Sequence, residues 1–517
     1  MSRKRKQKPK RNKKYTPKTV ASTPAVGPRK PLVNQPLTQP IRILIWGATP
    51  YVITGFGNVM KQLLRRLYHN YPGQYDICQM GINYYGDHVD ELEITGSFNN
   101  GRFRQWPAAV QRSGLPMAYM FGQNRFVDLV KTLKFDFDMI FLAEDPFWLG
   151  GRIPTDPPGQ QRIFIDEIRK ALAIRKKPHI PIIGYFPIDG TPDKEWVDNL
   201  LKYDVPITYL PFGARFVAEK NKEMEGRVNV LPLGLDKAEF YPLPKEEVMA
   251  FKRAYFGEEN VDKYVVLNCN RNQIRKFLPA NLMAFKAFKD KYPDSIMYLH
   301  MRDAEQVGWN LPRAAKNIGL EIGKDIFFPA NFNINQGISV QDLNKIFNIA
   351  DMLTTTALGG GWELALTQAF ATKTLVVAPA NTSHVELCAG GRGLLYKCGD
   401  RLSHLAILRG DNEVIRPLPN TDDMVQKMIW ARENPEKVEE IKENAYKWTH
   451  DTILWEQLVP KWHDIFLKSR ALKVQREAHV QQQQQQQAQQ LLGAPPQGQG
   501  VAASVSFDEE EEEPCPS

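Results

Sequence analysis

Two cations five residues apart, Arg271 and Lys276, carry the clearest chemistry in the sequence. They lie in a loop, NCNRNQIRK over residues 268–276, between an apolar stretch and a helical pattern. An Arg fork and a compact Lys ammonium can converge on one diphosphate. Neutralising a leaving diphosphate is the main electrostatic task when a sugar is transferred from a nucleotide. The alternative for these residues is a solvated basic loop without a ligand.

A run of three glycines, Gly359, Gly360 and Gly361, is the second candidate site. It separates an apolar stretch that ends in three threonines from a helical pattern over residues 362–371. A glycine loop that opens a helix directs free backbone N–H groups and the positive helix end at a ligand, so an anionic or hydroxyl-rich guest is expected. An ordinary turn in an α/β sheet remains the alternative.

The elements that must position these loops form two series of alternating strands and helices. In the first, the apolar stretch at 43–46 is followed by a loop with Gly55 and Gly57 and by a helix over 58–69. The other expected strands of this series lie at 75–80, 139–143, 180–185, 207–210 and 228–231. The second series has expected strands at 264–268, 295–300, 325–328, 352–355 and 374–377. Such alternation predicts two α/β domains, each with a mostly parallel sheet covered on both faces.

The charge of +9 is unevenly distributed. Residues 1–40 hold twelve Lys or Arg and no acid, and residues 508–513 hold six acids, so removing both leaves +3 for the rest. Neither end can bury enough apolar surface to fold, and both are expected to be disordered. The basic arm could be a nuclear address, an arm that binds nucleic acid or an anionic surface, or a solubilising tail.

The five cysteines show no CxxC spacing, which argues against a disulfide framework and a structural zinc site. No apolar run approaches the roughly 18 to 20 residues of a membrane helix, and no secretory signal is recognisable. We expect a cytoplasmic protein, with a nuclear location as the alternative. The scattered His and Asp residues predict no metal site.

Several segments together resemble retaining GT-B glycosyltransferases of family 4, often called glycosyl transferase group 1. Residues 229–242 (NVLPLGLDKAEFYP) are similar to that family's domain-joining segment, and Arg271 with Lys276 matches its R-x4-K pair for the donor phosphates. Residues 344–355 (NKIFNIADMLTT) match the strand that leads into its acidic motif, and residues 54–57 (TGFG) match its first glycine loop.

The resemblance covers about residues 41–466 and implies two Rossmann-like domains facing a cleft. It also implies sugar transfer from a nucleotide-diphosphate sugar with retention of configuration and without a metal or other cofactor. The expected parts are a disordered tail (1–40), an N-terminal acceptor-side domain (41–240), a C-terminal nucleotide-sugar domain (241–450), a C-terminal helix (451–474) and a disordered Gln-rich and acidic tail (475–517). Prolongation of the helix by the glutamine tract is the alternative for the last part.

The acidic motif departs from the family pattern, which has two Glu residues separated by seven others. Here Gly360 takes the first position and Gln368 the second, while Glu363 stands where a glycine is usual. Gln368 can still bond a ribose. Glu363 would replace the missing carboxylate only if it swings into the same space, and we expect the backbone around Gly361 and Trp362 to bind the sugar. Three interpretations stay open: altered donor geometry, altered donor identity, or a catalytically weakened relative.

Further site residues come from the N-terminal domain. Asp189 occupies a region where family members place a group near the donor sugar, and Gly55 and Gly57 would admit the donor phosphates or the acceptor. Glu144 and Asp145 follow a strand at its carboxyl end, where ligands bind, with helix capping as the alternative.

His384 is expected at the surface. The acceptor is not identified by the sequence. Two other functions remain open: a catalytically weakened nucleotide-sugar-binding or scaffold protein, and a transferase that acts on, or is tethered to, nucleic acid.

Overall fold

The structure is a computed structural model that describes residues 39–52, 54–84, 102–107, 121–153, 162–306, 308–330, 338–412 and 414–493. Backbone contacts separate Met1–Gln39 from a compact unit, Pro40–Ser517. All helices and strands that the structure describes belong to the second unit. The tail predicted at 1–40 lies almost wholly outside the described residues, as does the part of the predicted 475–517 tail beyond residue 493.

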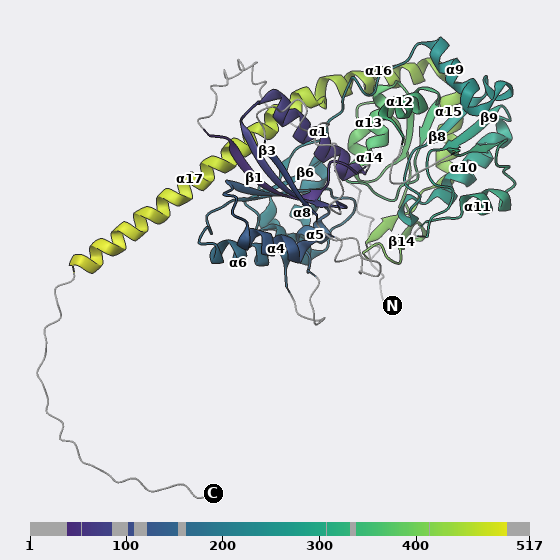
Figure 1. Ribbon diagram of the computed structural model, residues 1–517. Helices are drawn as coiled ribbons and strands as arrows, with labels where there is room; N and C mark the ends of the chain where they lie inside the picture. Colours follow the sequence, from purple (N-terminus) through teal and green to yellow (C-terminus); the bar gives the residue numbers. More distant parts are fainter. Residues whose placement is uncertain are drawn as a thin grey trace, which may run out of the picture. The chain divides into compact units, whose positions relative to one another are not determined.

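The first half of this unit forms a seven-stranded parallel sheet in the order β3-β2-β1-β4-β5-β6-β7 (Figure 1). Its strands are β1 (Ile41–Ala48), β2 (Tyr75–Ile82), β3 (Arg102–Pro107), β4 (Met139–Ala143), β5 (Ile182–Phe186), β6 (Val205–Thr208) and β7 (Asn229–Val230). Strands β4 and β5 are buried along their whole length, as expected for a parallel sheet covered on both faces. The edge strand β3 was not predicted.

Helices cover both faces of this sheet. They are α1 (Gly55–Asn70), α4 (Gln123–Thr132), α5 (Pro146–Leu149), α6 (Phe164–Ile174), α7 (Lys194–Leu200) and α8 (Pro211–Lys220). On one face Trp46 packs edge-on against Phe164 of α6, with ring centroids 4.9 Å apart. On the other face Phe141 packs against Trp462 of the last helix at 5.4 Å. Because successive side chains of a strand point to opposite faces, the apolar side chains on both faces of the sheet are buried under helices.

Helix α1 begins three residues before the predicted start at 58. Thr54 is its N-cap, and the Thr54 hydroxyl accepts a hydrogen bond from the Gly57 N–H at 3.1 Å. A Cβ at Gly57 would overlap the Val52 carbonyl oxygen. Gly55 and Gly57 thus form the first turn of the helix, and the preceding loop is shorter than the sequence indicated.

The second half forms a six-stranded parallel sheet in the order β10-β9-β8-β11-β12-β13. Its strands are β8 (Tyr264–Asn268), β9 (Ser295–Leu299), β10 (Ile326–Phe327), β11 (Met352–Thr354), β12 (Leu375–Pro379) and β13 (Leu394–Tyr396). Its helices are α9 (Lys245–Phe256), α10 (Leu278–Lys291), α11 (Leu311–Asn317), α12 (Val340–Asn348), α13 (Leu364–Ala371), α14 (Thr382–Leu387), α15 (Thr421–Glu433) and α16 (Pro435–Thr452). Short 3-10 turns lie at Lys222–Met224, Glu258–Asn260, Ile274–Lys276 and Leu402–His404.

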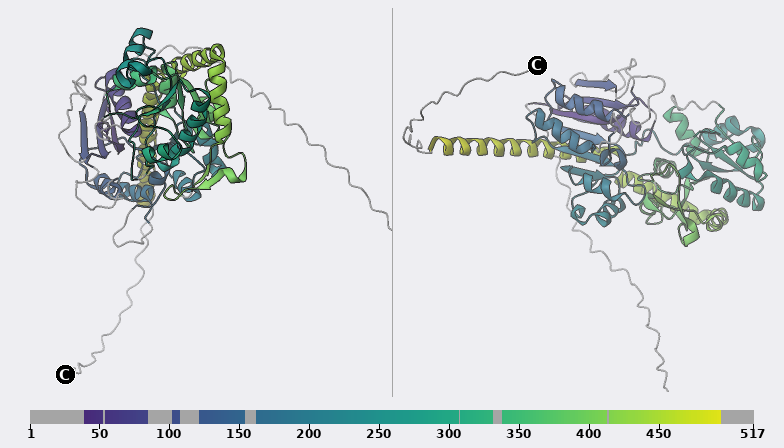
Figure 2. Two further views of the ribbon diagram at one scale, coloured as in Figure 1. Left: turned by 90° about the vertical axis from the view of Figure 1, so that its right-hand side faces the viewer. Right: turned by 90° about the horizontal axis from the view of Figure 1, so that it is seen from below.

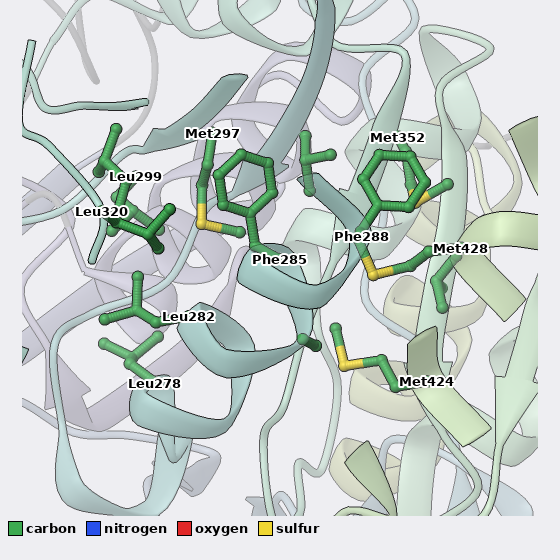
Figure 3. Close-up of a cluster of buried hydrophobic side chains, with 14 of the residues drawn as sticks. Leu278, Leu282, Phe285, Phe288, Met297, Leu299, Leu320, Met352, Met424 and Met428 are labelled. Carbon is green, nitrogen blue, oxygen red and sulfur yellow. The ribbon is translucent and has the colours of Figure 1, made fainter. Parts of the chain in front are cut away.

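The core of the second sheet lies under α10. Figure 3 shows Phe285 and Phe288 of this helix among methionines of the strands and of α15, including Met297, Met352 and Met428. All five side chains are fully buried. Two α/β domains of this kind, each with its own core, confirm the predicted pair of Rossmann-like domains.

An antiparallel hairpin that the sequence did not predict follows β13. It consists of β14 (Leu405–Ile407) and β15 (Ile415–Pro417). Ile407 and Ile415 face solvent with 62% and 59% exposure, whereas Arg416, next to Ile415, is only 2% exposed. Since side chains alternate along a strand, the hairpin turns this one arginine inward.

The last helix, α17 (Trp455–Gly493), returns to the first sheet (Figures 1 and 2). His463 stacks on Tyr71 with centroids 3.7 Å apart, and its Nδ1 lies 2.5 Å from the Tyr75 hydroxyl. Further along, the Lys473 ammonium donates to Asp138 at 2.9 Å. The helix continues beyond residue 474 through the glutamine tract to Gly493. Residues 475–493 therefore prolong the helix, which was the alternative to the predicted disordered tail. No helix within the described ranges is long and apolar enough to cross a membrane.

We expect the contact between α17 and the first sheet to stabilise that sheet strongly. Trp462 is 1% exposed and packs on Phe141 and Tyr185. Trp462→Ala should lower the free energy of unfolding by about 3–5 kcal/mol, because it leaves a cavity. Val474→Ala, at a position 56% exposed on the same helix, is the control and should change it by less than about 0.5 kcal/mol. Urea unfolding measures both, and equal effects would contradict the packing role of the helix.

Candidate functional site

A buried ion pair joins the two loops singled out by the sequence. Lys276 ends the 3-10 turn Ile274–Lys276 after β8, and Glu363 immediately precedes α13. Their side chains are 10% and 6% exposed, and the ammonium bonds the carboxylate directly. Burial lowers the pKa of Lys276 despite the attraction of Glu363. Burial alone would raise the pKa of Glu363, but the charge and the hydrogen bond of Lys276 outweigh it and the pKa is lowered.

The Glu363 carboxylate occupies the space that a side chain at position 360 would need. A Cβ placed on Gly360 would lie 2.7 Å from Oε1 of Glu363. The Gly360 N–H donates to the Thr382 hydroxyl at 3.0 Å, and its carbonyl accepts from the Ser383 N–H at 3.2 Å. The loop is therefore held by the start of α14, with the Glu363 carboxylate beside it.

Asp189, after β5 of the first sheet, meets two arginines of the second domain. Arg275 approaches its carboxylate at 3.4 Å and donates to the Gly359 carbonyl at 3.1 Å. Arg416, the inward residue of the hairpin, donates to the Asp189 carbonyl at 2.5 Å and is itself held by Asp411 at 2.6 Å. Burial alone would raise the pKa of Asp189, but the charges of Arg275 and Arg416 outweigh it, so the pKa is lowered.

The glycines allow these loops to touch. A Cβ at Gly359 would overlap the Asp189 carbonyl oxygen, and a Cβ at Gly361 would overlap the Pro187 ring. The first turn of α1 also reaches this region, because a Cβ at Gly55 would lie 3.9 Å from Leu364 of α13. The glycine loop after β11 thus lies against the loop after β5, and only glycine fits at the two contact points.

Two carboxyl groups at the end of β4 lie beside this junction. Burial raises the pKa of Asp145 to about 6, helped by the Asp189 charge and opposed by Arg275 and Arg416. Burial and the Asp145 charge raise the pKa of Glu144 well above its usual range. The Asp145 side chain makes no hydrogen bond to the first turn of α5, so helix capping does not explain this residue.

The other predicted residues are less closely gathered. Arg271 is more than half exposed, and Glu305 lies 3.6 Å from it. Gln368 is 8% exposed on α13, and Trp362 is 9% exposed with an indole N–H that has no partner among the described residues. In the described part of the chain, no three His, Cys, Asp or Glu side chains gather as metal ligands would.

Sequence reasoning missed three residues of the site. Arg275 adjoins Lys276 in the basic loop, so its position was visible but its partner was not. Arg416 had no signal, because its hairpin was not recognised. His384, expected at the surface, is fully buried. Its Nδ1 lies 2.7 Å from Asn381 Oδ1, and burial lowers its pKa to about 4 despite the Glu363 charge, which keeps the ring neutral at pH 7.

Comparisons with solved structures agree with the fold. Sucrose-phosphate synthase from Thermosynechococcus elongatus matches with a TM-score of 0.60 at 14% identity over 84% of this chain and 99% of that chain. Anabaena HepE in complex with UDP-glucose gives 0.55 at 12% over 83% and 100%. A glycosyltransferase from Rickettsia africae gives 0.57 at 13% over 83% and 98%. No protein-family model and no curated protein matches this chain.

We predict that the Lys276–Glu363 pair is costly to break on one side. Glu363→Gln leaves a buried ammonium without its counter-charge and should lower the free energy of unfolding by about 3–5 kcal/mol. The double variant Lys276→Met/Glu363→Leu should recover most of this loss. Lys194→Met, which removes an exposed pair with Asp198, is the matched control and should cost less than about 1 kcal/mol. A single and a double variant of equal stability in urea unfolding would argue against the coupling.

A second prediction concerns pH. The usual pKa of 3.8 rises to about 6 for Asp145, so the folded chain holds this proton to higher pH than the unfolded chain does. This group therefore lowers the free energy of unfolding as pH rises from about 4 to about 6. Asp145→Asn should be more stable than the parent by about 1–3 kcal/mol at pH 8, and equal to it near pH 4. Urea unfolding at both pH values tests this, with the exposed Asp128→Asn as control; equal stability at pH 8 would refute it.

Proposed function

We propose that this chain is a glycosyltransferase that moves a sugar from a nucleotide-diphosphate donor to a hydroxyl-bearing acceptor with retention of configuration. The observation that carries the proposal is the Lys276–Glu363 pair beside the glycine loop, at the carboxyl edge of the second sheet. The GT-B fold supports it, since one similar structure holds UDP-glucose and another is a sucrose-phosphate synthase. Ligands of such sheets bind at this edge.

In this proposal the donor diphosphate lies along the basic loop. Lys276 supplies a point charge, and Arg271, exposed on the same loop, supplies a planar fork for the phosphate oxygens. The buried ammonium is the stronger element, because a charge in a water-excluded site acts over a low dielectric. Gln368 bonds the ribose hydroxyls, and the backbone at Gly361 and Trp362 faces the sugar.

Two carboxylates flank the sugar. Glu363 takes over the space at Gly360, so it can accept hydrogen bonds from sugar hydroxyls while remaining paired with Lys276. Asp189 holds its negative charge through its two arginines and lies across the loop junction. A fixed negative charge near the anomeric carbon stabilises the positive charge that grows there as the glycosidic bond breaks.

The sugar passes directly from the donor to the acceptor, and no further reactant is needed. The acceptor hydroxyl oxygen bonds to the anomeric carbon while the bond from that carbon to the donor phosphate oxygen breaks. The electron pair leaves with the diphosphate, and the hydroxyl proton passes to that leaving oxygen on the same face of the sugar. Lys276 and Arg271 stabilise the diphosphate, and we propose that no metal ion or other cofactor is required.

The test measures turnover of a panel of nucleotide sugars, with and without EDTA. Arg271→Ala and Lys276→Ala should each lower kcat/KM by about 10²–10³-fold, by analogy with loss of a donor that stabilises developing charge. Arg253→Ala, which removes an exposed arginine on α9, is the control. Circular dichroism at the assay temperature separates loss of turnover from loss of folding.

Unchanged turnover in both variants would reject the assignment. Nucleotide-sugar binding by the parent without transfer or hydrolysis would instead favour the weakened, binding-only relative. Nucleic-acid affinity that disappears when residues 1–40 are deleted, and that falls steeply with salt, would support a nucleic-acid partner for the basic arm.

A further inference from the structure

We propose that Glu144 and Asp145 bind the acceptor, and that the acceptor is an uncharged, hydroxyl-rich molecule such as a sugar or polyol. This inference rests on the proposed transferase function and names the substrate class of its second site. The two residues are called the β4 acids.

The β4 acids lie at the ligand-binding edge of the first sheet. Strand β4 ends at Ala143, and the Glu144 N–H donates to the Tyr185 carbonyl of neighbouring β5 at 3.3 Å. Strand β5 ends one residue later, and its following loop carries Asp189. Side chains that follow neighbouring parallel strands meet at one edge, so the three carboxyl groups share it.

Within the described ranges, the chain supplies no hydrogen-bond donor to the side chains of the β4 acids. Glu144 is 6% exposed, yet its Oε2 has no partner there. Asp145 directly precedes α5, but it is the Asp145 carbonyl, not its side chain, that accepts from the Trp148 and Leu149 N–H groups, at 2.9 and 3.1 Å. A buried carboxyl oxygen without a donor destabilises the fold, so a ligand that provides one would be bound strongly.

Other buried carboxylates of the same sheet show that this is unusual. Asp138, directly before β4, accepts from Lys473 at 2.9 Å, and Asp204, before β6, accepts from Arg476 at 2.6 Å. Both are therefore fixed by cations of α17. The β4 acids lack such partners among the residues that the structure describes, although they are equally close to strand ends, which sets them apart from structural carboxylates.

The position suits an acceptor. Arg275, whose charge reaches Asp145, donates to the Gly359 carbonyl of the glycine loop. A molecule held by the β4 acids would thus lie beside the loop that faces the donor sugar. Its hydroxyl could then meet the anomeric carbon from the side of the first sheet.

The carboxyl groups at this edge of the first sheet favour an uncharged acceptor. Carboxyl oxygens accept hydrogen bonds from hydroxyl groups, and a polyol offers several such donors. A phosphate-rich acceptor would instead meet the carboxylates of Asp145 and Asp189 at close range, and like charges repel in a low-dielectric site. The arginines nearby are already engaged by Asp189 and Asp411. A neutral polyol is therefore favoured over a nucleic acid or a sugar phosphate.

The test uses the full chain with UDP-glucose as donor probe. Glucose, maltose and glycerol serve as neutral acceptors, and glucose 6-phosphate and a short DNA serve as anionic ones. Glu144→Gln and Asp145→Asn keep the side-chain shape, and Asp128→Asn on the exposed face of α4 is the control. Calorimetry gives the UDP-glucose Kd, and transfer assays give kcat/KM for each acceptor.

We expect both variants to lose at least about tenfold in kcat/KM for the neutral acceptor, mainly through KM, with the UDP-glucose Kd within about twofold of the parent. Unchanged acceptor kinetics in both variants, or a preference of the parent for glucose 6-phosphate or DNA, would overturn the inference and leave the proposed function intact. Absence of UDP-glucose binding and of transfer by the parent across the nucleotide-sugar panel would defeat the proposed function, and this inference with it.

Discussion

The contact between Asp189 and the two arginines, Arg275 and Arg416, is the interaction on which the candidate site depends. One carboxylate of the first domain fixes two cations of the second, Arg275 of the basic loop and Arg416 of the hairpin strand β15, and Arg275 also holds the glycine loop. Since the arginines outweigh the cost of burial, the group stays ionised and the contact persists across the neutral pH range. The close approach of Gly359 and Gly361 is possible because this charge cluster holds the loops together.

Much of the fold follows from the sequence. Apolar strands such as β4 and β5 are buried on both sides, so their uninterrupted hydrophobic runs were readable, and the restart of the pattern after residue 241 indicated a second domain. Short elements were not readable. Strand β3 begins Arg-Phe-Arg, and the two three-residue strands of the hairpin depend on a turn and on tertiary contacts rather than on periodicity. Element starts set by capping, as at Thr54, also shifted.

The site was predictable only in part. The basic loop and the glycine loop were found from their composition. The position of the Glu363 carboxylate beside Gly360, which the sequence left open, comes from the structure. Contacts between the two domains could not be predicted, because the residues that pair are far apart in the sequence. Asp189 and Arg416, for example, are separated by more than two hundred residues. The residue type alone does not show whether a histidine such as His384 is buried, because its burial depends on the tertiary packing around it.

The return of α17 to the first sheet has a consequence for how the protein is made. The first sheet is covered by side chains, such as Trp462, that follow the whole second domain in the sequence and are therefore synthesised after it. The first domain must therefore wait, with one apolar face open, until the second domain has been synthesised. During that interval the nascent chain exposes a surface that chaperones recognise, and the second domain, continuous in sequence, is able to fold first.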